Sequence, residues 1–189
     1  MPPVGFAVVG LGALATTAIL PAFRGMQRAR LVALVSRDIE KARRLASEHD
    51  VPSAYDSLDK CLTNHQVEAV YVATPPGEHL REEEYAALAN RHVLCEKPLA
   101  VTAAEAAEMV AICARQSVLL MTAYRKCFEP STVFIRNLIL SQWAGGPGKH
   151  LLQRRLQLHA LSRGNVRFGL ALPCVPLRTR AGPERPRRR

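Results

Sequence analysis

Acidic side chains are nearly missing from the last part of this 189-residue sequence. After Leu140 there are eleven lysines and arginines and a single acid, Glu184. Up to Leu140 the two signs balance, with 15 basic and 15 acidic residues, so the net charge of +10 arises entirely after that point. The basic character is thus a property of the tail alone, and it predicts no acidic partner for the first 140 residues.

The five cysteines form no C-x-x-C pair. Such pairs are typical of metal sites and redox-active dithiols, so the sequence predicts neither. An odd number of widely spaced cysteines fits a reducing compartment, and we expect a cytoplasmic protein.

A charge-free run extends from Val4 to Phe23 and raises the question of a signal peptide or a membrane span. No basic residue precedes the run, and three glycines, two threonines and Pro21 interrupt it. Both features are atypical of targeting and spanning segments. We interpret the run as a strand, a tight turn and a helix, and we expect no membrane partner.

Apolar runs that are typical of buried strands alternate with stretches of helical spacing up to Leu140. The runs are GFAVVG (5–10), LVALVS (31–36), AVYVAT (69–74), HVLCE (92–96) and SVLLMTA (117–123). Asp38 is placed to cap one intervening helix, and Thr102 with Glu105 forms a capping box for another. Strands that are apolar on both faces and alternate with helices of about 10 to 15 residues predict an α/β fold with a doubly wound parallel sheet.

The alternation stops near Ser141. Residues 141–189 contain five prolines, are rich in glycine and end in RPRRR. We therefore predict two parts: residues 1–140, an α/β domain, and residues 141–189, a basic tail that is poorly ordered apart from a loosely matched helical pattern around 149–162.

The sequence GLGALA at residues 10–15 matches the G-x-G-x-x-A form of the dinucleotide fingerprint. Gly10 would make the tight turn, Gly12 would let a pyrophosphate approach the backbone, and Ala15 would let the helix pack on the strand. Free N–H groups at the helix start would hold the anion. The alternative is a plain structural turn. The predicted cofactor contacts in this turn are Gly10, Leu11, Gly12, Ala13 and Leu14.

Ser36, Arg37 and Asp38 follow the second predicted strand, where an NAD-binding domain usually places an acid on the ribose hydroxyls. Arg37 would instead pair with a 2′-phosphate and stack on the adenine, which favours NADP over NAD as the cofactor. The alternative is an exposed arginine, with Asp38 serving as the acid or capping the next helix.

Two further strand ends carry candidate cofactor contacts. The residues there are Thr74, Pro75, Pro76, His79, Glu96 and Lys97. The carboxyl ends of parallel strands meet at the edge where open α/β sheets bind ligands, and a charged pair is costly in a core but useful in a site. His79 taken alone is more typical of a solvated helix residue than of a catalyst.

Five segments, in this order and spacing, resemble the glucose-fructose oxidoreductase / inositol dehydrogenase / MocA (Gfo/Idh/MocA) family. They are FAVVGLGALA, VSRD, YVATPPGEH, HVLCEKPLAVT and LMTAYRKCFEP, and E-K-P is the most specific part. The resemblance covers about residues 4–140. It implies a Rossmann-type cofactor domain and hydride transfer between NAD(P) and a carbinol carbon of a sugar, cyclitol or similar polyol.

The resemblance also implies roles for individual residues. Lys97 would lie beside the nicotinamide and assist proton transfer as the catalytic residue, and Glu96 and Arg125 would lie near the cofactor. The bond between Lys97 and Pro98 is often cis in that family.

The sequence departs from the family after Leu140. Family members continue with a second α+β domain that forms the substrate pocket and the oligomer face and contains an aspartate followed four residues later by a histidine. No aspartate follows Leu140 here. We therefore expect a truncated oxidoreductase in which cofactor binding outlasts catalysis, with exposed apolar surface that favours self-association.

The tail leaves alternatives open. It is either an interaction arm or a frame-shifted remnant of the second domain, and its composition favours the remnant. A basic nucleic-acid-binding protein is disfavoured because the tail has no aromatic platforms and no recognisable module. A dinucleotide-binding module without catalysis is the other alternative function.

Overall fold

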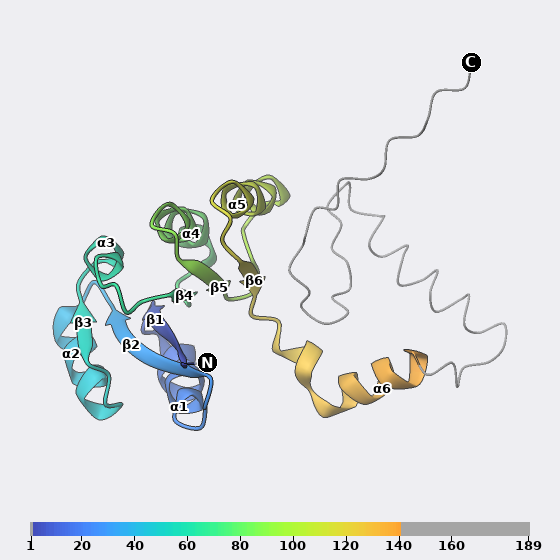
Figure 1. The fold of residues 1–189 in the computed structure, drawn as a ribbon, viewed down its shortest axis with the longest axis horizontal. Coiled ribbons are helices and arrows are strands. Elements are labelled where there is room, and N and C mark those ends of the chain that lie inside the picture. The colour runs from blue at the N-terminus through green and yellow to red at the C-terminus, as the bar shows by residue number, and fades with distance from the viewer. Residues whose placement is uncertain (1, 141–189) are drawn as a thin grey trace, which may run out of the picture. The chain divides into compact units, whose positions relative to one another are not determined.

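The sheet is six-stranded and parallel, with the order β3-β2-β1-β4-β5-β6 (Figure 1). The computed structural model describes residues 2–140 of the chain. The strands are β1 (Val4–Val9), β2 (Ala29–Val35), β3 (Ser53–Tyr55), β4 (Ala69–Val72), β5 (His92–Cys95) and β6 (Leu120–Thr122). The strand order reverses between β1 and β4, which is the point where such sheets bind ligands. The predicted Rossmann-type doubly wound sheet is confirmed.

Helices connect the strands. They are α1 (Leu20–Phe23), α2 (Ile39–Glu48), α3 (Leu58–Leu62), α4 (His79–Leu88), α5 (Ala103–Arg115) and α6 (Pro130–Leu140), with a π-helical turn (Ala15–Ile19) before α1 and 3₁₀ turns at Pro76–Glu78 and Arg125–Phe128. Asp38 caps α2 by accepting a hydrogen bond from the Lys41 amide, and Thr102 with Glu105 forms the capping box of α5. Both predicted caps are confirmed. Strand β3 and helices α3 and α6 were not predicted.

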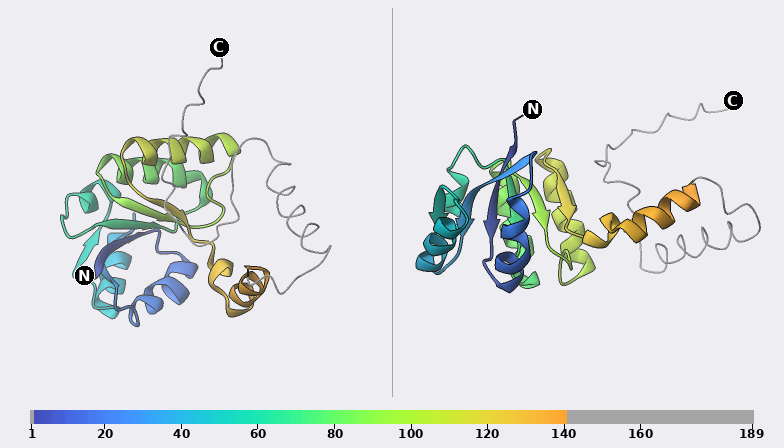
Figure 2. Two further views of the ribbon diagram at one scale, coloured as in Figure 1. Left: turned by 45° about the vertical axis from the view of Figure 1, so that its right-hand side comes forward. Right: turned by 90° about the horizontal axis from the view of Figure 1, so that it is seen from below.

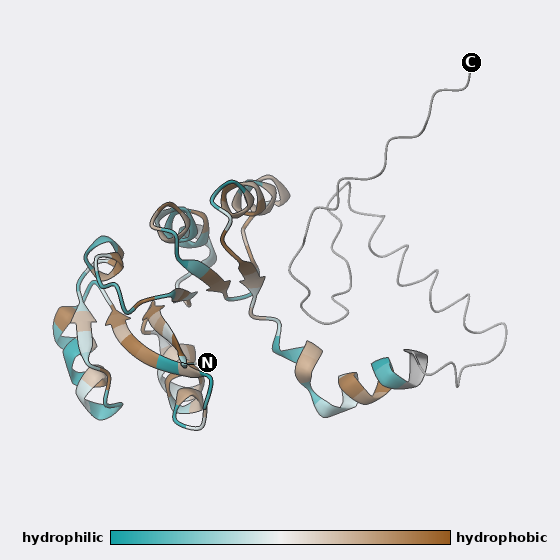
Figure 3. Cartoon of the chain, viewed as in Figure 1, coloured by the Kyte–Doolittle hydropathy of each residue, from teal (hydrophilic) through white to brown (hydrophobic). Residues whose placement is uncertain are grey.

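Helices lie on both faces of the sheet (Figure 2), and an apolar layer is buried on each face. On one face α3, α4 and α5 supply residues such as Cys61, Ala86 and Met109. On the other, the segment from Ala15 to Leu20 and helix α2 pack on the sheet. Strand β4 is buried along its whole length, as expected for a central strand of a parallel sheet. Figure 3 colours β6 and the end of β5 as hydrophobic.

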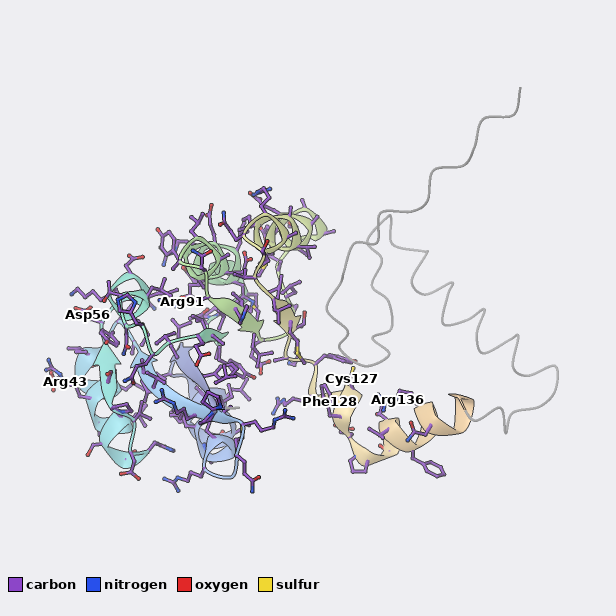
Figure 4. All side chains as sticks on the ribbon, viewed as in Figure 1. Arg43, Asp56, Arg91, Cys127, Phe128 and Arg136 are labelled. Atoms are coloured by element: carbon purple, nitrogen blue, oxygen red, sulfur yellow. The ribbon has the colours of Figure 1, made fainter. Side chains whose placement is uncertain are left out.

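The chain after β6 has several exposed apolar side chains. Tyr124, Phe128, Phe134 and Ile135 are each more than half exposed, and Figure 4 labels Phe128. Exposed apolar surface of this kind favours association, and self-association itself stays a prediction.

Several predictions lie outside the described residues. They concern the disorder of residues 141–189, the helical pattern around 149–162 and the nature of the tail. Among residues 2–140, no helix is long and apolar enough to cross a membrane. The same part of the chain contains no group of three or more side chains that could hold a metal ion.

Candidate functional site

The turn after β1 lies against the end of β4. Gly10 has a φ of +88°, and a Cβ atom there would lie 2.6 Å from the backbone of both Ala73 and Thr74. Only glycine combines that backbone conformation with so close an approach. A Cβ atom on Gly12 would meet nothing within 4 Å, so the space above this residue is open. The turn therefore combines a crowded glycine with one whose backbone faces free space.

The side chains of the turn divide between core and surface. Leu11 and Ala15 are buried in the layer below the turn, whereas Ala13 is exposed and Leu14 is half-buried. Leu11 can therefore contact a ligand only through its backbone. A small side chain at Ala15 lets the following segment pack directly on the sheet, as the fingerprint requires.

At the end of β2, Asp38 is engaged and Arg37 is exposed. The Asp38 carboxylate accepts the Lys41 amide at 3.0 Å, and the Ser36 hydroxyl oxygen accepts the Asp38 amide at 3.2 Å. Arg37 takes part in none of the ion pairs found among residues 2–140. The acid at this strand end thus caps a helix, and the guanidinium group is accessible.

At the end of β4, His79 is buried, so its interpretation as a solvated helix residue was wrong. Its side chain is 1% exposed. Nε2 lies 2.9 Å from the Thr74 carbonyl oxygen, and the Thr74 hydroxyl donates to Glu82 at 2.5 Å. Burial of the Glu82 carboxyl is the main cause that raises its pKa, against the lowering effect of the Thr74 hydrogen bond. His79 thus contacts the backbone at the start of the Thr74-Pro75-Pro76 segment, and its role as a cofactor contact stays a prediction.

At the end of β5, Glu96 is buried and Lys97 is exposed. The Tyr71 hydroxyl donates to one Glu96 carboxylate oxygen at 2.8 Å, and the Lys97 amide donates to the other at 3.1 Å. Burial, and next the hydrogen bond to Glu96, raise the pKa of the Tyr71 phenol. The carboxylate is thus fixed at both oxygens. The Lys97–Pro98 peptide bond is cis, as the family resemblance implies.

Arg125 begins the 3₁₀ turn after β6 and adds a positive charge to this region. It is exposed, and it is close enough to Tyr71 to lower the pKa of the phenol in part. The ends of β1, β4, β5 and β6 therefore bring the glycine turn, Thr74, Lys97 and Arg125 to one edge of the sheet. Arg37 lies at the end of β2 on the same edge.

Two residues of this region were missed by the sequence analysis. Tyr71 lies within a fully apolar strand, where its hydroxyl group is the sole polar atom among the side chains. Glu82 follows His79 by three residues on α4, a spacing that places two side chains on one helix face. The polar group in an apolar strand and the three-residue spacing from His79 are the sequence features that could have identified Tyr71 and Glu82.

A parallel sheet with this turn at its switch point is the architecture of a dinucleotide-binding domain. Residues 4–124 match the family model described as "Oxidoreductase family, NAD-binding Rossmann fold" (GFO_IDH_MocA). The chain belongs to the Gfo/Idh/MocA oxidoreductase family.

Three relatives illustrate the match. Human trans-1,2-dihydrobenzene-1,2-diol dehydrogenase is 29% identical over 178 residues, which cover 90% of this chain and 53% of the relative. D-xylose 1-dehydrogenase (NADP(+)) 2 of Haloferax volcanii is 33% identical over 137 residues, covering 72% of this chain and 42% of the relative. The crystal structure of aldose-aldose oxidoreductase from Caulobacter crescentus complexed with glycerol has 35% identity and a TM-score of 0.67, covering 72% of this chain and 43% of that chain.

The chain spans about half the length of the curated relatives it matches. A match to 90% of the chain must include residues after Leu140, so the similarity to the human enzyme extends into the tail. The frame-shifted remnant stays a prediction beside this similarity.

Proposed function

We propose that this chain is the cofactor-binding part of an NAD(P)-dependent oxidoreductase acting on a sugar, cyclitol or polyol-like substrate in the cytoplasm. The observation that carries the proposal is the sheet edge itself. The open Gly12 turn follows β1, and Lys97 follows β5, which is two strands away in the sheet. The names of the relatives support the substrate class, because D-xylose and aldoses are polyhydroxylated carbonyl compounds.

Each residue has a distinct task in this proposal. The backbone around Gly12 would bind the cofactor pyrophosphate, and bound nicotinamide would supply the hydride chemistry. The Lys97 amine would move a proton at the substrate oxygen, since its side chain is exposed at the ligand edge. Glu96 would keep a fixed position beneath the cofactor, because both of its carboxylate oxygens are already bonded. Arg125 would add positive charge near the cofactor.

NADP is the cofactor that the end of β2 favours. Asp38 uses its carboxylate to cap α2, so it is less suited to bind the ribose hydroxyls. Arg37 is exposed and would bind the 2′-phosphate of NADP through charge-assisted hydrogen bonds.

The test is a titration with NADPH and NADH, followed by nicotinamide fluorescence. We expect Arg37→Ala to weaken NADPH binding about tenfold or more, because a hydrogen bond to a charged group contributes about 1.5 to 3 kcal/mol. NADH binding should weaken much less, because NADH shares the adenine on which Arg37 would stack but lacks the 2′-phosphate. Arg43→Ala is the matched control, since Arg43 is an exposed arginine on α2. Equal weakening of both cofactors in Arg37→Ala would contradict the NADP preference, and binding of neither cofactor by the wild type would contradict the proposal.

A dinucleotide-binding module without turnover is the second candidate. It is favoured by the matched family model, which covers residues 4–124 and describes an NAD-binding fold. Oxidation of a panel of aldoses and polyols with NADP separates the two candidates. Turnover that disappears in Lys97→Met supports the enzyme, whereas tight cofactor binding without turnover in either protein supports the module.

A further inference from the structure

The buried ring of His79 contacts three backbone carbonyl oxygens and no donor among the described residues. Nε2 lies 2.9 Å from the Thr74 oxygen, and Nδ1 lies 3.1 Å from both the Pro98 and the Leu99 oxygens. The three carbonyl groups belong to two loops, one after β4 and one after β5. His79 is the first residue of α4, so one side chain links three segments of the chain.

The chemistry of these contacts restricts the protonation state of the ring. A neutral imidazole has one N–H donor and one acceptor nitrogen, whereas the imidazolium has two donors. A carbonyl oxygen only accepts, so a neutral ring would direct a lone pair at a carbonyl oxygen on one side or the other. We infer that His79 is a buried, doubly protonated imidazolium that fastens the loop after β4 to the loop after β5 and thereby positions Lys97.

Most of the other buried polar groups near this place are acidic. Among the described residues, the buried polar or charged side chains are His79 and three acids, Glu82, Glu83 and Glu96. All three acids lie close enough to Cys95 to raise the pKa of its thiol, after the larger effect of burial. Cys95 in turn donates to the Leu99 carbonyl oxygen at 3.8 Å, the same oxygen that faces His79. The histidine is the one buried base in this acidic surrounding.

Glu82 interacts electrostatically with His79. The charge of His79 lowers the pKa of Glu82, opposing the larger effect of burial. Thr74 connects the two groups, because its carbonyl oxygen faces His79 and its hydroxyl donates to Glu82. The other charged groups near Glu82 are Glu78, in the 3₁₀ turn before α4, and Arg81, on α4, which pair with each other at 3.0 Å.

The consequence concerns Lys97, which immediately precedes Pro98. Its backbone is fixed on one side by the Lys97 amide on Glu96 and on the other by the Pro98 and Leu99 carbonyl oxygens on His79. His79 is therefore a positioning residue, which acts through the loop and does not touch a ligand. This inference holds whether or not the chain binds a cofactor.

The chain contains its own control. His92 accepts a hydrogen bond from the Leu119 amide at Nδ1 at 3.1 Å, so its Nδ1 carries no hydrogen. His79 and His92 thus differ in the number of ring hydrogens that their surroundings require.

Magic-angle-spinning NMR of the full chain, with ¹⁵N-labelled histidine rings at neutral pH, measures this difference and tolerates self-association. We expect both ring nitrogens of His79 to carry hydrogen and only Nε2 of His92 to do so. The His79 signals should disappear in His79→Gln, and the His92 signals in His92→Gln. A single ring hydrogen on His79 would overturn the inference.

Positioning of Lys97 is tested in the same samples. The amide signals of Lys97 and Leu99 should shift in His79→Gln and stay in place in His92→Gln. If neither amide shifts in a folded His79→Gln variant, the positioning role is refuted. If that variant does not fold, the wild-type ring is identified by its through-space contacts to Pro98 and Leu99, and its hydrogen count still decides the protonation state.

Discussion

Glu83 and Glu96 are both buried carboxyl groups, but their surroundings differ. Glu83 is fully buried between α4 and α5, and Glu96 is 4% exposed at the end of β5. Both Glu96 oxygens accept hydrogen bonds, from the Tyr71 hydroxyl and the Lys97 amide. One Glu83 oxygen accepts the Cys113 thiol at 2.6 Å, and the other has no partner among the described residues.

The two buried carboxyl groups therefore differ in the number of their hydrogen-bond donors. Burial raises the pKa of Glu83 from its ordinary 4.5 to about 7, and the Cys113 thiol offsets this only partly. Glu96 has two donors, one at each carboxylate oxygen. The Glu83 carboxyl group between the helices thus takes up a proton near neutral pH, while the Glu96 carboxyl group at the ligand edge is held in place by a hydrogen bond at each oxygen.

The largest effect is expected from Glu83→Gln. The folded protein binds a proton at Glu83 up to about pH 7, while the unfolded carboxyl group releases it near 4.5. The free energy of unfolding should therefore fall as the pH rises from about 4.5 to about 7, by up to about 3 kcal/mol at 1.36 kcal/mol per pKa unit. Glu83→Gln should remove this fall and stabilise the protein at pH 8.

Urea unfolding at pH 5 and pH 8 measures this prediction. Glu84→Gln is the matched control, because Glu84 is exposed on the same helix. The comparison between Glu83 and Glu96 breaks down if Glu83→Gln changes the free energy of unfolding equally at both pH values.

Tyr71→Phe should leave Glu96, like Glu83, with one carboxylate oxygen that has no hydrogen-bond partner among the described residues. The substitution removes the donor to one Glu96 oxygen and leaves a buried carboxylate oxygen without a partner. We expect a loss of about 2 kcal/mol in the free energy of unfolding at pH 8, since an unsatisfied buried polar group costs about 1 to 3 kcal/mol. Urea unfolding gives the value, with Tyr85→Phe on the surface of α4 as the control. A loss as small as that of the control would mean that the hydrogen bond contributes little.

Cys113→Ala should raise the pKa of the Glu83 carboxyl group further. Without the thiol, both Glu83 oxygens lack a donor, and the pKa of Glu83 should rise further above 7 because the lost hydrogen bond favoured the charged form. At pH 8 the stability should fall by about 1 kcal/mol for the hydrogen bond, in addition to the loss of packing. The measurement is the pH midpoint of the stability change, compared with that of Cys61→Ala, another buried cysteine. An unchanged midpoint would show that the thiol does not contact the carboxylate.

The fold could be predicted from the sequence because its signals are local. Apolar runs, the glycine turn and the caps at Asp38 and Thr102 each depend on neighbouring residues, and all of them occur as expected. Strand β3 escaped prediction because it has three half-buried residues at the sheet edge. A segment so short has no periodicity to detect.

The polar network of the site depends on contacts across the chain, which local patterns do not contain. Tyr71 and Glu96 are 25 residues apart, and His79 contacts carbonyl groups 19 and 20 residues further on. The sequence placed Glu96 and Lys97 at the ligand edge through the rule for strand ends. It could not show that His79 is buried, because burial of a polar residue on a helix depends on what packs against it.

An exposed carboxylate completes the comparison and gives the smallest expected effect. Glu40 on α2 pairs with Arg43 at 2.7 Å, with the two side chains 77% and 65% exposed (Figure 4 labels Arg43). Water already solvates both charges, so the pair contributes little. Glu40→Gln should change the free energy of unfolding by about 0.5 kcal/mol or less, and added salt should reduce that change further. A change as large as that of Tyr71→Phe, measured by urea unfolding in the same buffer, would mean that burial and missing partners do not explain why Glu83 and Glu96 differ.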